Sequence, residues 1–522
     1  MLYLCHGNQL EDLADRLVLD LTRPVKDVLA PDLIAVPGQG IARWLSLRLA
    51  HQQGIIANTL WQFPAELLWH LFRTILGNVP ATNAFSADAL AWRVLNVLID
   101  EEFVAAHPPL SHYLESGDPQ RRWQLAQRLG RLYEQYLVYR PDWISHWQYQ
   151  AAENWQGALW RQLIDAGDDR HWLIAQQEML RRLNSDPSAV KQLPERISLF
   201  ALPTLSPAYL EFLRAVSKHI DVTIYHQNFS RGYWAEIISE KERARLIANA
   251  GEAADQYFET GNSLLATMGR QGREQLAGLL QLEALETEVF RSPPSNTVLG
   301  QIQSDIFELR ERDDSQPFEL KPDDDSLQLH CCHSIMREIE IAHDQLLGLF
   351  QADHTLEPAD VLVLVPEIDV FAPYVDAVFG AATGNRYIPW RLVGRGLADA
   401  SPLVETFLAL LDLPFSRFEA DKVTALLDRP GLRRRFGLLE ADTEQVRRWV
   451  RELGICWGID TGDMAELEFS TGGRHTWRAG TDRLLLGHAL GEAGALFSGI
   501  LPRAPSDGGE AQIVGRLRTF LE

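Results

Sequence analysis

Short apolar runs alternate with amphipathic helical patterns along this chain, and that alternation limits the possible folds more than any other feature. Apolar runs at residues 2–5 and 33–36 each lead through a turn into a helical pattern. The same order returns at residues 197–201 and 222–225, which flank a helical pattern that begins near Pro207. Such alternation is typical of parallel sheets covered by helices, so the predicted fold class is α/β.

Changes in composition divide the chain into several parts. A long stretch with helical periodicity and few strands predicts a helical insertion whose two α/β flanks share one sheet. An acidic, proline-containing segment indicates a linker. Beyond it, apolar runs at 327–332 and 361–365, with helical patterns at 336–350 and 371–379, predict a second α/β domain. The predicted parts are a first α/β domain at 1–70 and 191–310, a helical insertion at 71–190, the linker at 311–326, the second α/β domain at 327–440, and the start of another insertion at 441–522.

Charge restricts the partners that the surface can attract. The 522 residues carry a formal net charge of -22, which disfavours a surface coated with phosphate-binding groups. A local channel lined by basic residues is compatible with this charge, and a basic partner subunit would add attraction for DNA. We therefore expect any nucleic-acid contact to be confined to a limited part of the surface.

Cysteine usage and the chain ends bear on the compartment. The four cysteines are too scattered for a disulfide framework, which indicates a reducing environment. The contiguous string at 330–333, HCCH, would alternate between the two faces of a strand, so buried strand positions are expected there rather than a zinc site. Without a signal-peptide pattern or a membrane-length apolar run, a cytoplasmic location is expected. The sequence stops within an amphipathic helical pattern, which suggests an N-terminal piece of a longer polypeptide.

The segment at 129–147 concentrates large aromatic residues and arginines. Its aromatic residues recur every three or four positions, with Arg131 and Arg140 nearby. Rings beside guanidinium groups can stack on unpaired bases and bind phosphates. The competing interpretation is that the aromatic stripe belongs to a hydrophobic core, which is its more frequent role. The aromatic residues are Tyr133, Tyr136, Tyr139, Trp143 and Trp147.

Two sheets with helical insertions match the layout of superfamily 1 helicases. More specifically, VPGQGIARWL at 36–45, YLVYRPDW at 136–143, CHSIMREIE at 332–340 and LLDLPFSRF at 410–418 resemble the RecC family, the gamma chains of exodeoxyribonuclease V. The resemblance runs along the whole chain and implies two RecA-like, P-loop NTPase-like parallel-sheet domains with helical insertions. It further implies RecB and RecD as partners in a RecBCD complex, and binding to double-stranded DNA ends. In such a complex the chain would guide the 3′ single strand and scan it for the recombination hotspot Chi.

The residues that an ATP-driven motor needs are missing from their expected positions. The first strand leads into HGNQLEDLA, which lacks the lysine and Ser/Thr of a phosphate-binding loop and places Glu11 and Asp12 where they would repel a triphosphate. The strand at 197–201 runs into Leu202, Pro203 and Thr204 rather than into magnesium-binding carboxylates. We therefore expect a noncatalytic subunit with no cofactor of its own, whose partner subunits use ATP and Mg²⁺.

The resemblance and the local chemistry together nominate DNA contacts. They lie in the turn after the second strand, in the segment that follows it, and around the aromatic run. Arg140 is the strongest single candidate for a DNA contact. The arginines at 433–435 and 447–451 fit a solvated face or a partner contact better than a DNA contact. The nominated residues are Gln39, Arg43, Phe63, Trp69, Arg131, Gln135, Arg140 and Trp143.

Two other functions stay open at this point. One is an active superfamily 1 helicase with an unorthodox nucleotide site at the glycine-containing turn 37–40. The other is an α/β metabolic enzyme whose aromatic residues are all core, although no Ser/His/Asp or Cys/His constellation is evident. ATP-dependent strand displacement would identify the first, and indifference to DNA the second.

Overall fold

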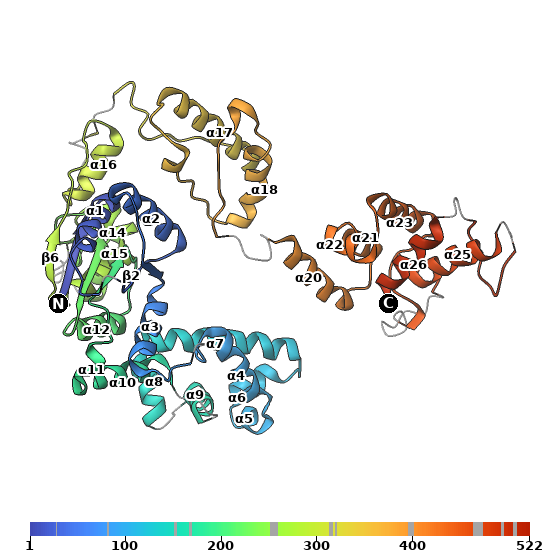
Figure 1. Ribbon diagram of the computed structural model, residues 1–522, viewed down its shortest axis with the longest axis horizontal. Coiled ribbons are helices and arrows are strands. Elements are labelled where there is room, and N and C mark those ends of the chain that lie inside the picture. The colour runs from blue at the N-terminus through green and yellow to red at the C-terminus, as the bar shows by residue number, and fades with distance from the viewer. Residues whose placement is uncertain are drawn as a thin grey trace. The chain divides into compact units, whose positions relative to one another are not determined.

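The chain forms two compact units in a computed structural model, Met1–Gln328 and Leu329–Glu522 (Figure 1). Each unit has its own hydrophobic clusters. The structure describes all residues except 28, 81–82, 151–153, 166–169, 251–258, 313–316, 319–320, 395–400, 463–472, 492–494 and 505–508.

A six-stranded parallel sheet organises the first unit, with the strand order β3-β2-β4-β5-β1-β6. Four of these strands match apolar runs in the sequence, but β3 and β6 were not predicted. The sequence TLWQ of β3 is short and only half-buried, and LETE of β6 is an acidic, largely exposed edge strand, so neither shows an apolar run. The strands are β1 Leu2–Gly7, β2 Asp32–Ala35, β3 Thr59–Gln62, β4 Arg196–Phe200, β5 Asp221–Gln227 and β6 Leu285–Glu288.

Helices cover both faces of this sheet, as a parallel sheet requires. Because successive side chains of a strand point to opposite faces, Leu33 and Ala35 join one hydrophobic core while Ile34 joins the other. The smaller core packs helices α1 (Leu10–Leu21) and α2 (Gln39–Gln53) against the sheet. The larger core continues from the opposite face into the helices between β3 and β4.

Helices alone connect β3 to β4 among the described residues. They begin at α3 and end at α11, and the strands on both sides of them belong to one sheet, which confirms that the flanks of a helical insertion share a sheet. The exact domain boundaries stay predictions. These helices are α3 Pro64–Leu76, α4 Ala87–Ile99, α5 Glu101–Ala105, α6 Pro108–Leu114, α7 Pro119–Tyr139, α8 Pro141–Tyr149, α9 Trp155–Asp165, α10 Trp172–Ser185 and α11 Pro187–Val190. The remaining helices of the unit are α12 Pro207–Val216, α13 Glu240–Ala250, α14 Ser263–Met268, α15 Arg270–Leu280 and α16 Val298–Phe307.

Helices joined by loops make up the described part of the second unit. One small cluster, with Ile339, Phe379 and Ile388 buried, joins α17 and α18, and a larger cluster joins α21, α23, α25 and α26. The α-helices are α17 Ile335–Ala352, α18 Ile368–Phe379, α20 Pro402–Asp412, α21 Ala420–Leu427, α22 Pro430–Phe436, α23 Glu440–Leu453, α25 Trp477–Leu490 and α26 Glu510–Leu521. Short 3-10 turns lie at Pro358–Asp360, Gly384–Arg386 and Leu413–Phe415.

The strands predicted at 327–332 and 361–365 are wrong for this structure. Neither segment pairs with a neighbour, and Leu362 and Leu364 are 81% and 83% exposed. A strand needs a hydrogen-bonded partner, and the described residues of the second unit offer only an isolated bridge between Phe497 and Ile500. The predicted helices on either side of the second segment, α17 and α18, are confirmed.

The HCCH string also differs from its prediction. Cys331 is exposed and Cys332 half-buried, so these cysteines are not the buried strand positions that we expected. Across the described ranges, no three His, Cys, Asp or Glu side chains are grouped so that they could hold a metal ion. The same ranges contain no helix long and apolar enough to cross a membrane.

Candidate nucleic-acid interface

Helix α7 carries a continuous polar stripe on its exposed face. Asp118 caps its N-terminus by accepting a hydrogen bond from the Gln120 amide at 2.9 Å, and Pro119 occupies the first turn. The opposite face packs Leu129, Tyr133 and Leu137 into the larger core of the first unit. The exposed residues that follow helical spacing are Gln120, Gln124, Arg128, Arg131, Gln135 and Tyr139.

This stripe is basic although the chain as a whole is strongly acidic. Helix α7 contains four arginines and a single carboxylate, Glu134. Glu134 accepts a hydrogen bond from the Ala87 amide at the start of α4, at 3.1 Å, so its carboxylate is engaged at the N-terminus of a neighbouring helix. Neither Arg128 nor Arg131 forms an ion pair with any carboxylate in the described part of the chain. Both guanidinium groups are thus available to an external anion.

A cavity of 350 Å³ lies beside the C-terminal end of the stripe. It brings together Trp69 of α3 and Gln135 of α7, two residues that the sequence nominated from distant segments. Trp172 and Tyr209 also line it, with their rings in edge-to-face contact at 5.1 Å. Burial raises the pKa of the Tyr209 phenol to about 12, so its hydroxyl group is neutral at physiological pH. The cavity offers aromatic faces together with amide groups, which suits a planar, hydrogen-bonding ligand.

Arg140, the first candidate from the sequence, is already engaged within the chain. It lies between α7 and α8, where its Nε donates to Asp142 at 3.0 Å and its terminal nitrogen donates at 2.8 Å. Its guanidinium carbon also lies 3.6 Å from the centroid of the Trp143 ring. The hydrogen bond to Asp142 raises the pKa of Arg140, and Arg140 in turn lowers the pKa of Asp142. A phosphate would have to compete with this carboxylate.

The aromatic run splits between core and surface. Tyr133 is fully buried and donates a hydrogen bond to the Gln156 carbonyl at 2.7 Å, and Trp147 is buried beside it, so the core interpretation is confirmed for these two residues. Tyr139 and Trp143 are exposed. The cause is geometric: positions 133, 136 and 139 drift around α7 by about 60° at each step of three residues, so they leave the buried face.

The remaining candidates lie at the carboxyl ends of adjacent strands. Gln39 begins α2 just after β2, and Arg43 is exposed one turn later. Phe63 is the N-terminal cap of α3 directly after β3, which pairs with β2 in parallel, so both groups share one edge of the sheet. Helix α3 then leads from Phe63 to Trp69, a rise of roughly 9 Å toward the cavity.

The loop between β1 and α1 is covered by the chain that follows β6. Asn8 accepts a hydrogen bond from the Arg291 amide at 2.9 Å and donates one to its carbonyl at 2.8 Å. The Arg291 side chain pairs with Asp12 in the first turn of α1. A Cβ atom on Gly7 would lie 2.5 Å from the Val289 carbonyl oxygen, so the two segments are in close contact.

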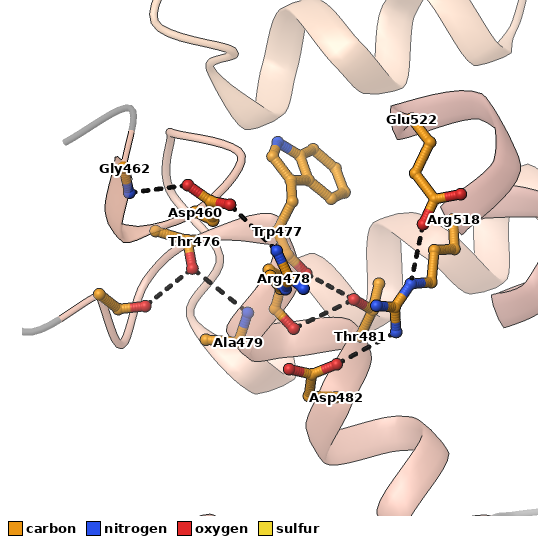
Figure 2. A network of polar contacts seen from close by, with 11 residues as sticks. Asp460, Gly462, Thr476, Trp477, Arg478, Ala479, Thr481, Asp482, Arg518 and Glu522 are labelled. Carbon is orange, nitrogen blue, oxygen red and sulfur yellow. Dashed lines mark hydrogen bonds and ion pairs between the residues drawn. The ribbon is translucent and has the colours of Figure 1, made fainter. Parts of the chain in front are cut away.

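Arginines of the second unit are largely neutralised by carboxylates nearby. Arg447 pairs with Asp428 and Glu444, and Arg451 also approaches Glu444. Figure 2 shows the same situation around α25 and α26, where Asp460 holds Arg478 and where Arg518 contacts both Asp482 and Glu522. Thr476 caps α25 within this network by accepting from the Ala479 amide. These pairs favour a structural role for the arginines that form them, whereas Arg434, Arg435 and Arg448 are exposed without a carboxylate partner among the described residues.

Comparison with known proteins assigns the chain to a family. Residues 2–309 match the family described as RecC, N-terminal domain, and residues 400–522 match the RecBCD enzyme subunit RecC fourth domain. The chain belongs to the RecC family. It is 34% identical to the RecBCD enzyme subunit RecC of Escherichia coli K12, 32% identical to that of Haemophilus influenzae and 30% identical to that of Mycolicibacterium smegmatis, each over 100% of this chain. It covers 51%, 51% and 49% of these proteins, so it spans about half the length of the curated relatives it matches.

Sequence reasoning missed part of the surface on this RecC-family chain. It nominated Arg131 and Gln135 but not Gln120, Gln124 and Arg128, which complete the stripe on α7. The signal was present, because these residues recur at helical spacing in a helix with one acidic residue. By contrast, no local pattern brings Trp172 and Tyr209 to the cavity, since they come from α10 and α12.

Proposed function

We propose that this chain is a noncatalytic DNA-binding subunit of a RecBCD-type helicase and exonuclease, and that it guides an unpaired DNA strand along α7. The observation that carries the proposal is the exposed stripe of Gln and Arg residues, with Arg128 and Arg131 free of carboxylate partners and an aromatic cavity at its end. Arginines bind phosphates, and rings and amides contact unpaired bases, which is the composition of a single-strand channel.

The strand would pass from the stripe to the edge of the sheet. Gln135 and Trp69 at the cavity, and then Phe63, Gln39 and Arg43 at the ends of β3 and β2, form the continuation of such a path. Gln and Arg side chains can pair with base edges, so this path has the chemistry to scan a 3′ strand for a hotspot such as Chi. Arg140, stacked on the ring of Trp143, would add a positive charge beside this path.

The chain would not hydrolyse ATP itself. Support comes from the covered β1–α1 loop, where Arg291 contacts both Asn8 and Asp12 at the position that a phosphate-binding loop would take. Glu11 and Asp12 add negative charge to the first turn of α1, which opposes a triphosphate. ATP and Mg²⁺ would then be used by the partner subunits, and this chain would hold no cofactor.

The partners follow from the relatives. These are named as RecC subunits of the RecBCD enzyme, so we assign RecB and RecD as partners, double-stranded DNA ends and the unwound single strand as ligands, and double-strand break repair in the cytoplasm as the setting. The functions would be homologous recombination and resection of DNA ends.

The second unit would begin a second RecA-like domain. Its exposed apolar segment at 361–365 has the continuous hydrophobicity of a central parallel strand, and α17 and α18 flank it as crossover helices would. The sheet of the first unit, with its parallel order and covering helices, supplies the other RecA-like domain.

Titration of a fluorescent single-stranded oligonucleotide at several salt concentrations tests this function. The double variant Arg128→Gln, Arg131→Gln should bind more weakly and with a smaller salt dependence than the parent chain, because two phosphate contacts are lost. A matched control, Arg433→Gln with Arg447→Gln, removes the same charge from the second unit and should bind as the parent does. Equal losses in both double variants would show that only net charge matters, which would overturn the assignment to α7.

Nucleotide chemistry provides the second test. The purified chain should neither bind ATP stoichiometrically nor hydrolyse it, with or without single-stranded DNA. The opposite result would be ATP hydrolysis that co-purifies with the chain and disappears when the turn at 37–40 is altered. That result would establish a motor with an unorthodox nucleotide site.

A further inference from the structure

A tryptophan pair, with one exposed and one half-buried ring, lies beside the stripe of α7. Trp92 of α4 is 61% exposed, and its ring contacts that of Trp123 of α7, with 4.5 Å between the ring centroids and 41° between the planes. Tryptophan has the largest apolar side chain. Because the exposed ring of Trp92 rests on the ring of Trp123, a wide aromatic face is open to water. Nothing in the fold of the described residues covers that face.

Close packing of the two helices explains why this pair lies at the surface. A Cβ atom on Gly130 would lie 2.5 Å from the Ala87 carbonyl oxygen and 2.8 Å from the Ala91 amide, so α4 and α7 are in backbone contact there. Such a contact leaves no room for large side chains between the helices. Trp92 and Trp123 therefore lie over the outer margin of the interface, beside the polar stripe.

The surroundings of the pair are polar. One turn from Trp123 on α7 lie Gln120 and Gln127, both exposed, and Asn96 is exposed one turn from Trp92 on α4. Asp88 is the acidic group on the same face of α4, one turn before Trp92, and the arginines of the stripe, Arg128 and Arg131, lie further along α7 from Trp123. A helix from a protein partner would need an apolar surround, but these groups suit the phosphates and base edges of a nucleic acid.

We infer that Trp92 and Trp123 form a second base-stacking site for an unpaired DNA strand, separate from the cavity at Trp69 and Gln135. The inference rests on the proposed function of α7. Trp123 precedes Gln135 by twelve residues on one helix, which places the two sites roughly 18 Å apart. At a spacing of about 3.4 Å for each nucleotide, a strand of about five nucleotides connects them, with Arg128 and Arg131 between.

Stacking at this site would be tolerant of sequence. Every base has a π face, so an indole platform holds a strand without selecting among bases, whereas the amide groups at the cavity are able to distinguish base edges. The two sites would thus have different roles. The tryptophan pair would hold the strand against α7, and the cavity would contact individual bases as the strand moves.

Oligonucleotides of two lengths test the inference on the full chain. Oligodeoxythymidylates of 4 and 12 nucleotides are titrated against the parent, Trp92→Ala, Trp92→Phe and Arg131→Gln, with Tyr233→Ala as control because Tyr233 is equally exposed, at 58%, in another part of the unit. We expect Trp92→Ala to weaken binding of the 12-mer by about 5- to 100-fold and to leave the 4-mer unchanged. Trp92→Phe keeps an aromatic face and should recover most of the affinity.

The outcomes separate this inference from the function beneath it. If Arg131→Gln weakens binding but Trp92→Ala binds the 12-mer as the parent does, the tryptophan pair is not a DNA site and the proposed function stands. If Trp92→Ala instead impairs only assembly with partner subunits, the pair is a protein-docking surface, and the inference is overturned. If the parent binds neither oligonucleotide at low salt, both the inference and the proposed function fail. Thermal unfolding of each variant shows whether its fold is intact.

Discussion

Two regions of the chain share one sequence pattern but differ in structure. Residues 1–310 and 327–379 both alternate apolar runs with amphipathic helices. The first region forms a six-stranded sheet buried on both faces. In the second, the helices α17 and α18 form, but the apolar runs stay unpaired, and Ile339 and Phe379 belong to a small buried cluster that Ile388 completes from outside the region. A helix closes its hydrogen bonds within one segment, whereas a strand depends on a neighbour supplied by the rest of the fold.

The same two units differ in how their arginines are used. On α7, Arg128 and Arg131 face solvent without carboxylate partners. In the second unit, Arg447 and Arg518 are each held by two carboxylates. Basic residues alone therefore do not identify a nucleic-acid surface, since an arginine already paired with a carboxylate must exchange that partner for a phosphate.

The largest expected effect concerns strand burial. Ile34→Ala in β2 removes a fully buried side chain and should lower the free energy of unfolding by about 2–5 kcal/mol. Leu364→Ala removes a similar side chain from the exposed segment and should change it by less than about 0.5 kcal/mol. Urea denaturation of both variants measures the contrast. Equal losses would mean that residues 361–365 are buried in solution, and the difference between the two regions would disappear.

A pH titration tests how tightly the core of the first unit is closed. Burial lowers the pKa of His171 to about 4, below its ordinary value near 6.5, and its Nε2 lies 3.0 Å from the Gln148 side-chain oxygen. As the pH falls, His171 therefore binds a proton in the unfolded chain at a higher pH than in the folded chain. The free energy of unfolding should decline between pH 6.5 and 4, by about 3 kcal/mol at most for this residue. His171→Gln should flatten that decline in unfolding experiments. An unchanged slope would show that the imidazole is accessible to water.

The contrast between arginines predicts a smaller effect on binding. Arg131→Gln should weaken single-strand binding by roughly tenfold and reduce the salt slope by about one. Arg447→Gln should leave both quantities unchanged and destabilise the second unit by about 1 kcal/mol at most, because its pairs are partly exposed. Anisotropy titrations and thermal unfolding measure the two effects. A reversed pattern would transfer the DNA surface to the second unit.

The smallest effect concerns Arg140. Asp142→Asn removes the carboxylate that engages this side chain and should strengthen single-strand binding by about a factor of a few, since solvent screens an exposed pair of this kind and it competes only weakly with a phosphate. Arg140→Ala in the parent should weaken binding less than Arg131→Gln does. If Arg140→Ala is the more damaging change, Arg140 exchanges Asp142 for a phosphate on binding.

Local signals made much of the first unit predictable. Prolines at the first turn mark the starts of α3, α7, α8 and α12, and apolar runs located β1, β2, β4 and β5. Edge strand β6, with the sequence LETE, could not be predicted, because its pairing with β1 rather than its composition makes it a strand. Two of the candidate residues, Trp69 and Gln135, meet at one cavity, yet its wall at Trp172 and Tyr209 depends on how α10 and α12 pack.

The sequence by itself determined the helices, the alternation that builds a parallel sheet, the missing phosphate-binding lysine and the resemblance to RecC. These properties depend on neighbours within a few residues, where periodicity and turn chemistry act. Only the tertiary structure decided that Tyr133 is core while Tyr139 is exposed, that Glu134 turns to α4, and that Trp92 meets Trp123 at the surface. Each of these depends on a partner from a distant segment, and burial and electrostatic pairing are properties of the packed chain.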